Sequence, residues 1–300
     1  LPDASQPQLE LAVRAEITRL FDLHQGPLMR VKVIERAIDE WVLVLTLHHI
    51  TSDGWSMSLL VHEFVDLYSA FSAGHTSALQ PLVVQYADYA HWQRQWLDQG
   101  EMQRQQAYWV ERLGGEPVVL SLPTDHPRTA QLSDRGGRLD LRLPQDLERQ
   151  VRELAQAQGV TLFQLFLGTF ALLLQRYSGQ PDVRIGVPVN NRNSQELEAV
   201  VGFFVNTLIM RLCPQPEQSA GHWLQTVKEV TLSAQANQDL PFDRLVEVLN
   251  PQRALNHNPL FQVMYNHLST VGATATGTSL PGLQARELLL DGGAAQFELS

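Results

Sequence analysis

Apolar runs of two different periods alternate along this chain, and their alternation constrains the fold more than any other feature. The run 41–50, WVLVLTLHHI, is aliphatic and β-branched and contains neither Gly nor Pro, which predicts a buried strand. Strand-like runs also occur at 183–189, 205–212 and 261–266. Between them, apolar residues recur at three- and four-residue spacing, which predicts helices. The chain is therefore expected to have a mixed α/β or α+β fold.

Two helical regions can be identified from the sequence. Residues 86–113 have a helical pattern, with an interruption expected at Gly100. Thr161 is expected to begin an apolar core helix, and Gly179 lies just past its end. This apolar stretch is shorter than the roughly 20 residues that a membrane span needs, so we expect no membrane association.

Residues 114–137 differ in composition from their surroundings. They are rich in Pro, Gly and Asp and lack helical periodicity, which is typical of a connection between compact parts. We expect a crossover between two lobes here. The predicted N-terminal lobe comprises residues 1–125, and the predicted C-terminal lobe comprises residues 126–300.

Charge and cysteine content exclude several classes of function. The net charge is −10, without a visible basic patch, so nucleic-acid binding is not expected. The single cysteine, Cys213, excludes an internal disulfide and a CxxC metal site. No HExxH pattern or cysteine ligand set predicts a bound metal. With no signal peptide, we expect a reducing, cytoplasmic setting.

The residues His48-His49-Ile50-Thr51-Ser52-Asp53-Gly54 carry the most chemistry. Neighbouring side chains on a strand face opposite sides, so only one of the two histidines can face a given cavity. Imidazole can accept a proton near neutral pH, which makes His49 a candidate general base. Gly54 leaves room for a ligand or for backbone. A histidine on an apolar strand is also typical of a core residue with satisfied hydrogen bonds, and both interpretations stay open at this point.

The stretch HHITSDGWS resembles the HHxxxDG motif of condensation domains of non-ribosomal peptide synthetases, within the chloramphenicol-acetyltransferase-like superfamily. Other stretches resemble further motifs of that family in the same order. They are FDLHQGPL at 21–28, YADYAHW at 86–92, LPTDHPR at 122–128, IGVPVNNR at 185–192, GFFVNTL at 202–208, QDLPF at 238–242 and HNPLFQV at 257–263.

This resemblance implies a two-lobed fold with a channel between the lobes and His49 midway along it. The family's first two motifs would precede Leu1 and a further region would follow Ser300, so both lobes are expected to be incomplete. His49 is implied to accept a proton or to position the reacting amine. His48, Asp53, Gly54 and Arg192 are implied to support the motif. The candidates for lining the channel are Trp55, Ser56 and Asn206.

The implied reaction joins a donor acyl or peptidyl thioester to the amine of an acceptor aminoacyl thioester. Both substrates would be carried on phosphopantetheine arms by upstream and downstream peptidyl-carrier domains, next to an adenylation domain. The chain itself is expected to bind no cofactor. Whether so incomplete a chain is active alone stays open.

Three alternatives share this resemblance. Epimerisation relatives usually continue the motif as DGxSWR, whereas this chain continues Asp53-Gly54-Trp55-Ser56-Met57-Ser58, which favours condensation. A dual epimerising and condensing domain is a second alternative. A non-catalytic recruitment platform is the third, although such relatives tend to lose the histidine that corresponds to His49.

Asp53 and Arg192 are predicted to form an ion pair. Asp53 follows an apolar strand, so its carboxylate is expected to be buried, and a buried carboxylate needs a partner. Arg192 follows the strand predicted at 183–189, and its planar fork suits a carboxylate. The alternative is that Arg192 lies at the surface and that Asp53 only caps the helix beginning near Trp55.

Overall fold

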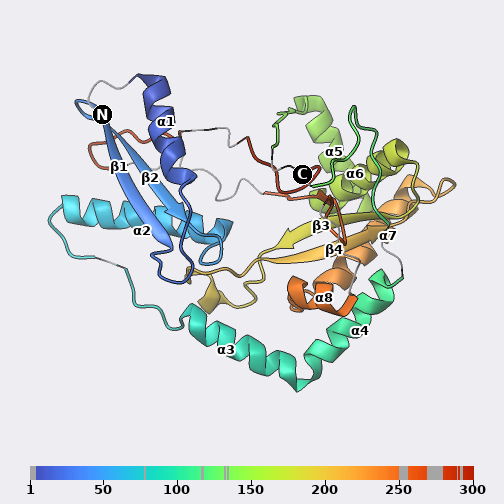
Figure 1. The fold of residues 1–300 in the computed structure, drawn as a ribbon. Coiled ribbons are helices and arrows are strands. Elements are labelled where there is room, and N and C mark those ends of the chain that lie inside the picture. The colour runs from blue at the N-terminus through green and yellow to red at the C-terminus, as the bar shows by residue number, and fades with distance from the viewer. Residues whose placement is uncertain are drawn as a thin grey trace. The chain divides into compact units, whose positions relative to one another are not determined.

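A computed structural model shows the mixed arrangement of helices and sheets that the sequence predicts (Figure 1). It describes residues 5–77, 79–115, 118–131, 133, 135–249, 256–268, 280–288, 290 and 293–300. The chain forms two compact units that interleave in sequence. Unit 1 is Leu1–Tyr89, Arg192–Phe204 and Thr270–Leu290, and unit 2 is Ala90–Asn191, Val205–Ser269 and Asp291–Ser300. The lobe boundary expected at 125/126 stays a prediction.

Unit 1 is built on a two-stranded antiparallel sheet of β1 (Met29–Ala37) and β2 (Glu40–Leu47). Helix α1 (Gln6–Ile17) packs on one face of this sheet, where Leu9 and Val13 meet Ile34 and Val44. Helix α2 (Gly54–Ser72) follows β2.

The expectation of a buried strand over 41–50 is wrong in two respects. Strand β2 ends at Leu47, before the two histidines. Its second face is half exposed: Trp41 and Leu43 have exposed fractions of 51% and 46%. Strand β2 therefore has the alternation of a sheet covered on one face in the described part of the chain.

Unit 2 contains a three-stranded sheet in the order β4-β3-β5. Strand β3 (Val183–Val189) pairs antiparallel with β4 (Asn206–Leu212) and parallel with β5 (Val263–Met264). The bounds of β3 are those predicted, β4 begins one residue later than expected, and β5 is shorter than expected. These strands are central to the larger hydrophobic core.

Helices surround that sheet. Helix α5 (Gln145–Gln158) is followed by α6 (Leu162–Ser178) and α7 (Ala220–Gln235), and α8 (Phe242–Leu249) precedes β5. The predicted ends of the core helix are confirmed, because Thr161 caps the start of α6 and Gly179 ends it in the left-handed conformation. Residues 139–143 alternate in polarity as a strand would (LDLRL), but they form no strand, and Leu139 and Leu141 are both exposed.

The helical region 86–113 is interrupted where the sequence predicts. Helix α3 (Tyr86–Trp96) leads through a π-helical turn (Leu97–Glu101) into α4 (Met102–Leu113). Gly100 in this turn has φ of 110°, a conformation that favours glycine, and it bends the path of the chain.

No single helix in the described residues is long and apolar enough to cross a membrane. Helices α5 and α6 together pass that test of length and composition, but they are bent by 102° at the break between them.

Gly186 is predicted to be indispensable to the packing of unit 2. A Cβ atom at this position of β3 would lie 2.3 Å from the Phe261 ring. Gly186→Ala is therefore expected to lower the free energy of unfolding by about 1–3 kcal/mol through overpacking. Urea denaturation measures this, with Gly137→Ala as the control, because a Cβ there meets nothing within 4 Å. Equal midpoints for the two variants would contradict the prediction.

Candidate active site

The histidine motif lies in the turn that joins β2 to α2, within unit 1. The His48 N–H donates to the Leu28 carbonyl (2.9 Å), and the His48 carbonyl accepts from the Thr51 N–H (3.0 Å). Neither histidine is part of the strand, so strand alternation does not determine which way they face. Their separate orientations come from the turn itself.

His48 is held by local contacts. Its Nδ1 accepts a hydrogen bond from the Ile50 N–H (3.1 Å), and its ring packs edge-on against Phe21 with centroids 5.7 Å apart. The side chain is half-buried. These contacts fit the structural part expected of His48, although the turn and not the strand pleat provides them.

His49 is exposed and is oriented through one ring nitrogen. Its Nδ1 lies 2.7 Å from the Ser52 carbonyl oxygen. A carbonyl can only accept a hydrogen bond, so Nδ1 carries the proton of the neutral ring and Nε2 has the free lone pair. The ring packs edge-on against Phe203, with centroids 5.2 Å apart. Nε2 has no hydrogen-bond partner among the described residues, so it is available to accept a proton.

Asp53 caps helix α2 and is fully buried. Its Oδ1 accepts from the Ser56 N–H and hydroxyl, both at 2.8 Å, and its Oδ2 accepts from the Phe204 N–H at 3.1 Å. Its side chain has 0% exposure. The capping role considered as the alternative to the ion pair is therefore present.

The predicted ion pair is present as well. Nη2 of Arg192 lies 3.1 Å from Oδ1 and 3.3 Å from Oδ2 of Asp53, and the Arg192 side chain is 1% exposed. The two alternatives for Asp53 thus coexist. Arg192 is not a surface residue, because its guanidinium is enclosed by the loop that follows it.

That loop binds the rest of the guanidinium. Nη1 of Arg192 donates to the carbonyls of Leu197 (2.6 Å) and Val200 (2.7 Å), and Nη2 also donates to the Ser56 hydroxyl (2.9 Å). The guanidinium carbon lies 3.9 Å from the centre of the Phe204 ring. Only Nε, which is buried, lacks a hydrogen-bond partner among the described residues. Arg192 therefore orders residues 192–204 around the start of α2.

The pKa values follow from this enclosure. Burial by itself would raise the pKa of the Asp53 carboxyl, but hydrogen bonds from Ser56 and Phe204 and the charge of Arg192 outweigh it and hold that pKa below its ordinary value. Burial lowers the pKa of Arg192, and the Asp53 carboxylate opposes that change. Burial, and then the charge of Asp53, raise the pKa of Tyr86.

Ser56 and Gly202 join the two segments directly. The buried Ser56 hydroxyl accepts from the Gly202 N–H (3.1 Å) and also lies 2.9 Å from the Gly202 carbonyl. A Cβ atom on Gly202 would lie 2.2 Å from the Tyr86 ring, so this position has room only for glycine. The hydroxyl of Ser56, a candidate for lining the channel, thus faces the ion pair and not open space.

An aromatic cluster packs against the ion pair. Tyr86 and Tyr89 contact Phe204 with ring centroids 5.1 and 4.7 Å apart, and the Tyr86 hydroxyl donates to the Phe203 carbonyl (2.8 Å). The YADYAHW and GFFVNTL stretches resemble family motifs, and the shared aromatic face of residues 86–96 predicts core packing but not its partners. Their aromatic content was the available signal, and the partners could be identified only from the fold.

The remaining candidate residues lie in different settings. Trp55 is 46% exposed, and its Nε1–H donates to the Glu198 carbonyl (2.8 Å). A Cβ atom on Gly54 would meet no described residue outside its own helix within 4 Å. Asn206 belongs to unit 2, where its amide donates to the carbonyls of Gln238 and Leu240 and accepts from the Phe242 N–H. The side-chain amide of Asn206 is therefore engaged in hydrogen bonds to backbone groups.

In the described part of the chain, no cluster of three or more His, Cys, Asp or Glu side chains could hold a metal ion. The candidate site consists of an oriented imidazole next to a buried ion pair. Against this geometry, a family model described as Condensation domain matches residues 2–283. The chain belongs to the condensation domain family.

Relatives of this condensation domain are peptide synthetases. It is 44% identical over 293 residues to malpinin synthetase of Mortierella alpina, and the match covers 98% of this chain and 4% of that protein. It is 42% identical over 292 residues to a linear gramicidin synthase of Brevibacillus parabrevis, covering 97% and 4%. Phosphinothricin tripeptide synthetase of Streptomyces viridochromogenes is 42% identical over 282 residues, covering 94% and 26%. The chain thus spans a small part of these relatives.

Solved structures share the fold. The X-domain from teicoplanin biosynthesis aligns with a TM-score of 0.80 at 28% identity, covering 88% of this chain and 60% of that one. The first condensation domain of the calcium-dependent antibiotic synthetase, with a substrate analogue, aligns with a TM-score of 0.67 at 20% identity, covering 87% and 58%. The chloramphenicol-acetyltransferase-like fold expected from the motifs is confirmed.

The two contributions of Asp53 can be separated by substitution. Asp53→Ala removes the cap and the counter-ion of Arg192, and is expected to lower the free energy of unfolding by about 3–5 kcal/mol. Asp53→Asn retains an acceptor for the Ser56 N–H and is expected to regain about 1 kcal/mol of that loss. Urea denaturation provides the measurement, and Asp66→Asn, an exposed change on the same helix, is the control. An Asp53→Ala protein as stable as the control would refute the buried pair.

Acid should weaken the same interaction. Because the folded-state pKa of Asp53 is lowered, its pairing contributes fully above the ordinary value of 3.8 and is lost as pH falls through the lower folded-state value. As pH falls below about 4, the wild type should therefore lose more free energy of unfolding than Asp53→Asn does. Parallel curves for the two proteins would show that Asp53 is not the group responsible.

Proposed function

We propose that this condensation domain forms an amide bond between a donor acyl or peptidyl thioester and an acceptor aminoacyl thioester, with His49 acting on the acceptor amine. One observation carries the proposal: the Nδ1–H of His49 is bound to the Ser52 carbonyl, which leaves Nε2 as an acceptor on an exposed ring. Identities of 42–44% to peptide synthetases support the substrate class.

The chemistry needs one proton acceptor. The amine nitrogen attacks the donor carbonyl carbon, the C–N bond forms, and the tetrahedral intermediate collapses by breaking the C–S bond. One amine proton must leave, and the departing thiolate must gain one. A free α-amine has a pKa of about 8, so part of it is protonated at neutral pH. Nε2 of His49 can accept a proton from the amine or hold the amine in the reactive orientation.

Asp53 has a different part from the carboxylate of a catalytic triad. The Nδ1 partner of His49 is the Ser52 carbonyl, and the Asp53 carboxylate is already bound by Ser56, Phe204 and Arg192. A carboxylate in such contacts fixes the turn that presents His49 and does not relay protons. We therefore treat Asp53 and Arg192 as positioning residues.

The proposal includes partners that the chain does not contain. The substrates would arrive on phosphopantetheine arms of upstream and downstream peptidyl-carrier domains, next to an adenylation domain, in the cytoplasm. A four-domain nonribosomal peptide synthetase bound to AMP and glycine is similar to this chain, with a TM-score of 0.75 at 28% identity, and the match covers 87% of this chain and 20% of that one. Such a multidomain setting supports tethered substrates.

A recruitment platform is the second candidate function. An X-domain that is 29% identical to this chain, with a TM-score of 0.78, was solved in a complex with OxyB. Such a platform would need no oriented imidazole, whereas His49 is present and oriented here. The two functions differ in one result, since a platform would form no amide from loaded carriers.

Substitution of His49 tests the proposal. In the synthetase polypeptide that contains this chain, with both carriers loaded, His49→Ala is expected to lower the rate of amide formation by about 10²–10⁴-fold, the usual contribution of general acid–base catalysis. His48→Ala is the matched control and should retain most of the rate. Product is measured by mass spectrometry after quenching. Unchanged condensation by His49→Ala would overturn the assignment.

His49→Gln distinguishes the two roles considered for His49, which are to accept a proton and to position the amine. Glutamine can hydrogen-bond the amine but cannot take up a proton at neutral pH. A rate as low as that of His49→Ala would identify His49 as the proton acceptor. A rate near wild type would assign it the positioning of the amine.

A further inference from the structure

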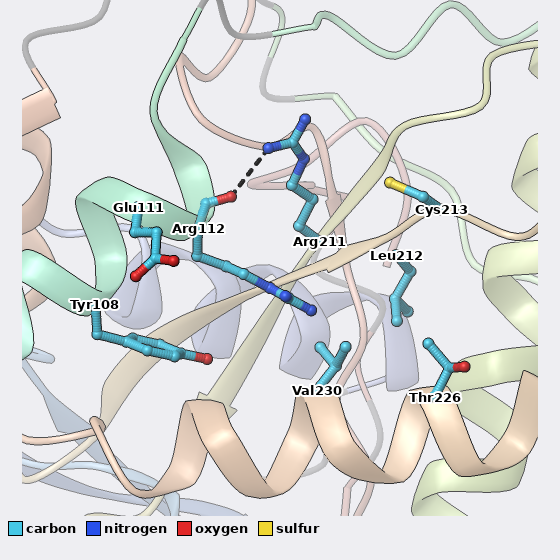
Figure 2. A pocket seen from close by; sticks show the side chains of 8 residues that line it. All are labelled: Tyr108, Glu111, Arg112, Arg211, Leu212, Cys213, Thr226 and Val230. Carbon is cyan, nitrogen blue, oxygen red and sulfur yellow. Dashed lines mark hydrogen bonds between the residues drawn. The ribbon is translucent and has the colours of Figure 1, made fainter.

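Unit 2 contains a cavity of about 430 Å³ next to the ends of α4 and β4 and the side of α7 (Figure 2). Its size falls in the range of pockets that bind small molecules. The lining residues are Tyr108, Glu111, Arg112, Arg211, Leu212, Cys213, Thr226 and Val230. None of them belongs to the histidine site of unit 1.

Positive charge is concentrated beside this cavity. Arg184 and Arg211 lie directly opposite each other on β3 and β4, and both contact one carboxylate, Asp182. Nη2 of Arg211 lies 2.9 Å from Oδ2 of Asp182, whereas Nη2 of Arg184 lies 3.5 Å from it. Like charges opposite each other on a sheet are destabilising. Arg184 is also 3% exposed on its side chain, and its buried Nε has no partner among the described residues.

Arg184 and Arg211 have a structural role. Arg184 donates to the Leu113 carbonyl (3.4 Å) and Arg211 donates to the Arg112 carbonyl (3.0 Å), so both bind the last carbonyls of α4. Cations are favourable at a helix C-terminus. This explains Arg184 and Arg211 but not the side chain of Arg112.

Arg112 is the group left to explain. Its guanidinium has no hydrogen-bond or ion-pair partner in the part of the chain that the structure describes, and Figure 2 shows its side chain extending into the cavity. Arg112, Arg184 and Arg211 carry positive charges in or beside the cavity. The carboxylates of Asp182 and Glu111 offset only two of these three charges, so the region has a net positive charge.

We propose that this cavity binds a small molecule that carries a carboxylate or phosphate group next to an apolar group. The planar fork of Arg112 suits either anion. Leu212 and Val230 provide an apolar wall. Burial raises the pKa of Tyr108, so its hydroxyl stays protonated and can donate a hydrogen bond to the anion.

Cys213 provides a reporter for occupancy. It is the only cysteine of the chain and lines the cavity. Iodoacetamide is neutral and alkylates this thiol at a rate that mass spectrometry can follow. A ligand in the cavity should slow alkylation. Phenyl phosphate and benzoate are the probes, benzamide is their neutral analogue, and chloride keeps the ionic strength constant.

We expect phenyl phosphate, benzoate or both to slow alkylation at least threefold at saturation, with benzamide having no effect. The stronger of the two probes identifies the preferred anion. Protection should weaken about tenfold in apparent affinity in Arg112→Gln and further in Arg112→Glu. Arg149→Gln, which alters an exposed arginine on α5, should keep the wild-type response. Each variant is compared with its own unprotected rate, because burial and then Asp182 raise the pKa of the Cys213 thiol, and the charges of Arg211 and Arg112 oppose that change.

Three results would overturn the proposal. The first is equal alkylation rates with and without the anionic probes. The second is equal protection of wild type and Arg112→Glu when circular dichroism shows both to be folded. The third is protection by an oligo-glutamate peptide alone, which would assign this surface to an acidic segment of a protein partner. All three are independent of amide formation, so they leave the proposed function untouched.

Discussion

A carboxylate and a guanidinium with almost no exposure to water, Asp53 and Arg192, join segments that lie 139 residues apart in the chain. Ionic groups withdrawn from water are destabilising unless every bond they need is supplied. Here the start of α2, the loop 192–204 and the Phe204 ring supply all but one of these bonds. The loop and the helix start are therefore ordered together, and Ser52, whose carbonyl orients His49, directly precedes Asp53.

This arrangement separates the charged pair from the reactive ring. His49 is exposed and bonded to a neutral carbonyl, whereas Asp53 is enclosed and bonded to Arg192. The partner at Nδ1 is a neutral carbonyl and not a carboxylate. It leaves Nε2 free to accept a proton, and it adds no negative charge that would stabilise the protonated ring. The Asp53–Arg192 pair thus affects the proposed reaction by fixing the turn that orients His49. Gly202 and the aromatic cluster around Phe204 complete the support, because close packing against Tyr86 leaves no space for another side chain.

Much of this could be predicted from the sequence where local rules act alone. The core helix between Thr161 and Gly179 follows from its caps, and β3 follows from a strand-like run in which apolar residues alternate with Arg184, Gly186 and Pro188. The Asp53–Arg192 pair could be predicted because a carboxylate after an apolar strand needs a partner. The strand boundary before His48 could not, since no Gly or Pro marks the end of the strand before Gly54. The Leu197 and Val200 carbonyls around Arg192 also escaped prediction, because backbone groups have no sequence signature.

The tautomer of His49 tests the central claim most directly. Nitrogen-15 chemical shifts of the imidazole ring distinguish a neutral ring protonated at Nδ1 from one protonated at Nε2. Our account predicts the Nδ1–H form in the folded wild type, and a mixture of forms in Asp53→Ala, where the turn that carries the Ser52 carbonyl is no longer fixed. A wild-type ring protonated at Nε2, or an unchanged tautomer in folded Asp53→Ala, would contradict the claim that the buried pair orients this histidine.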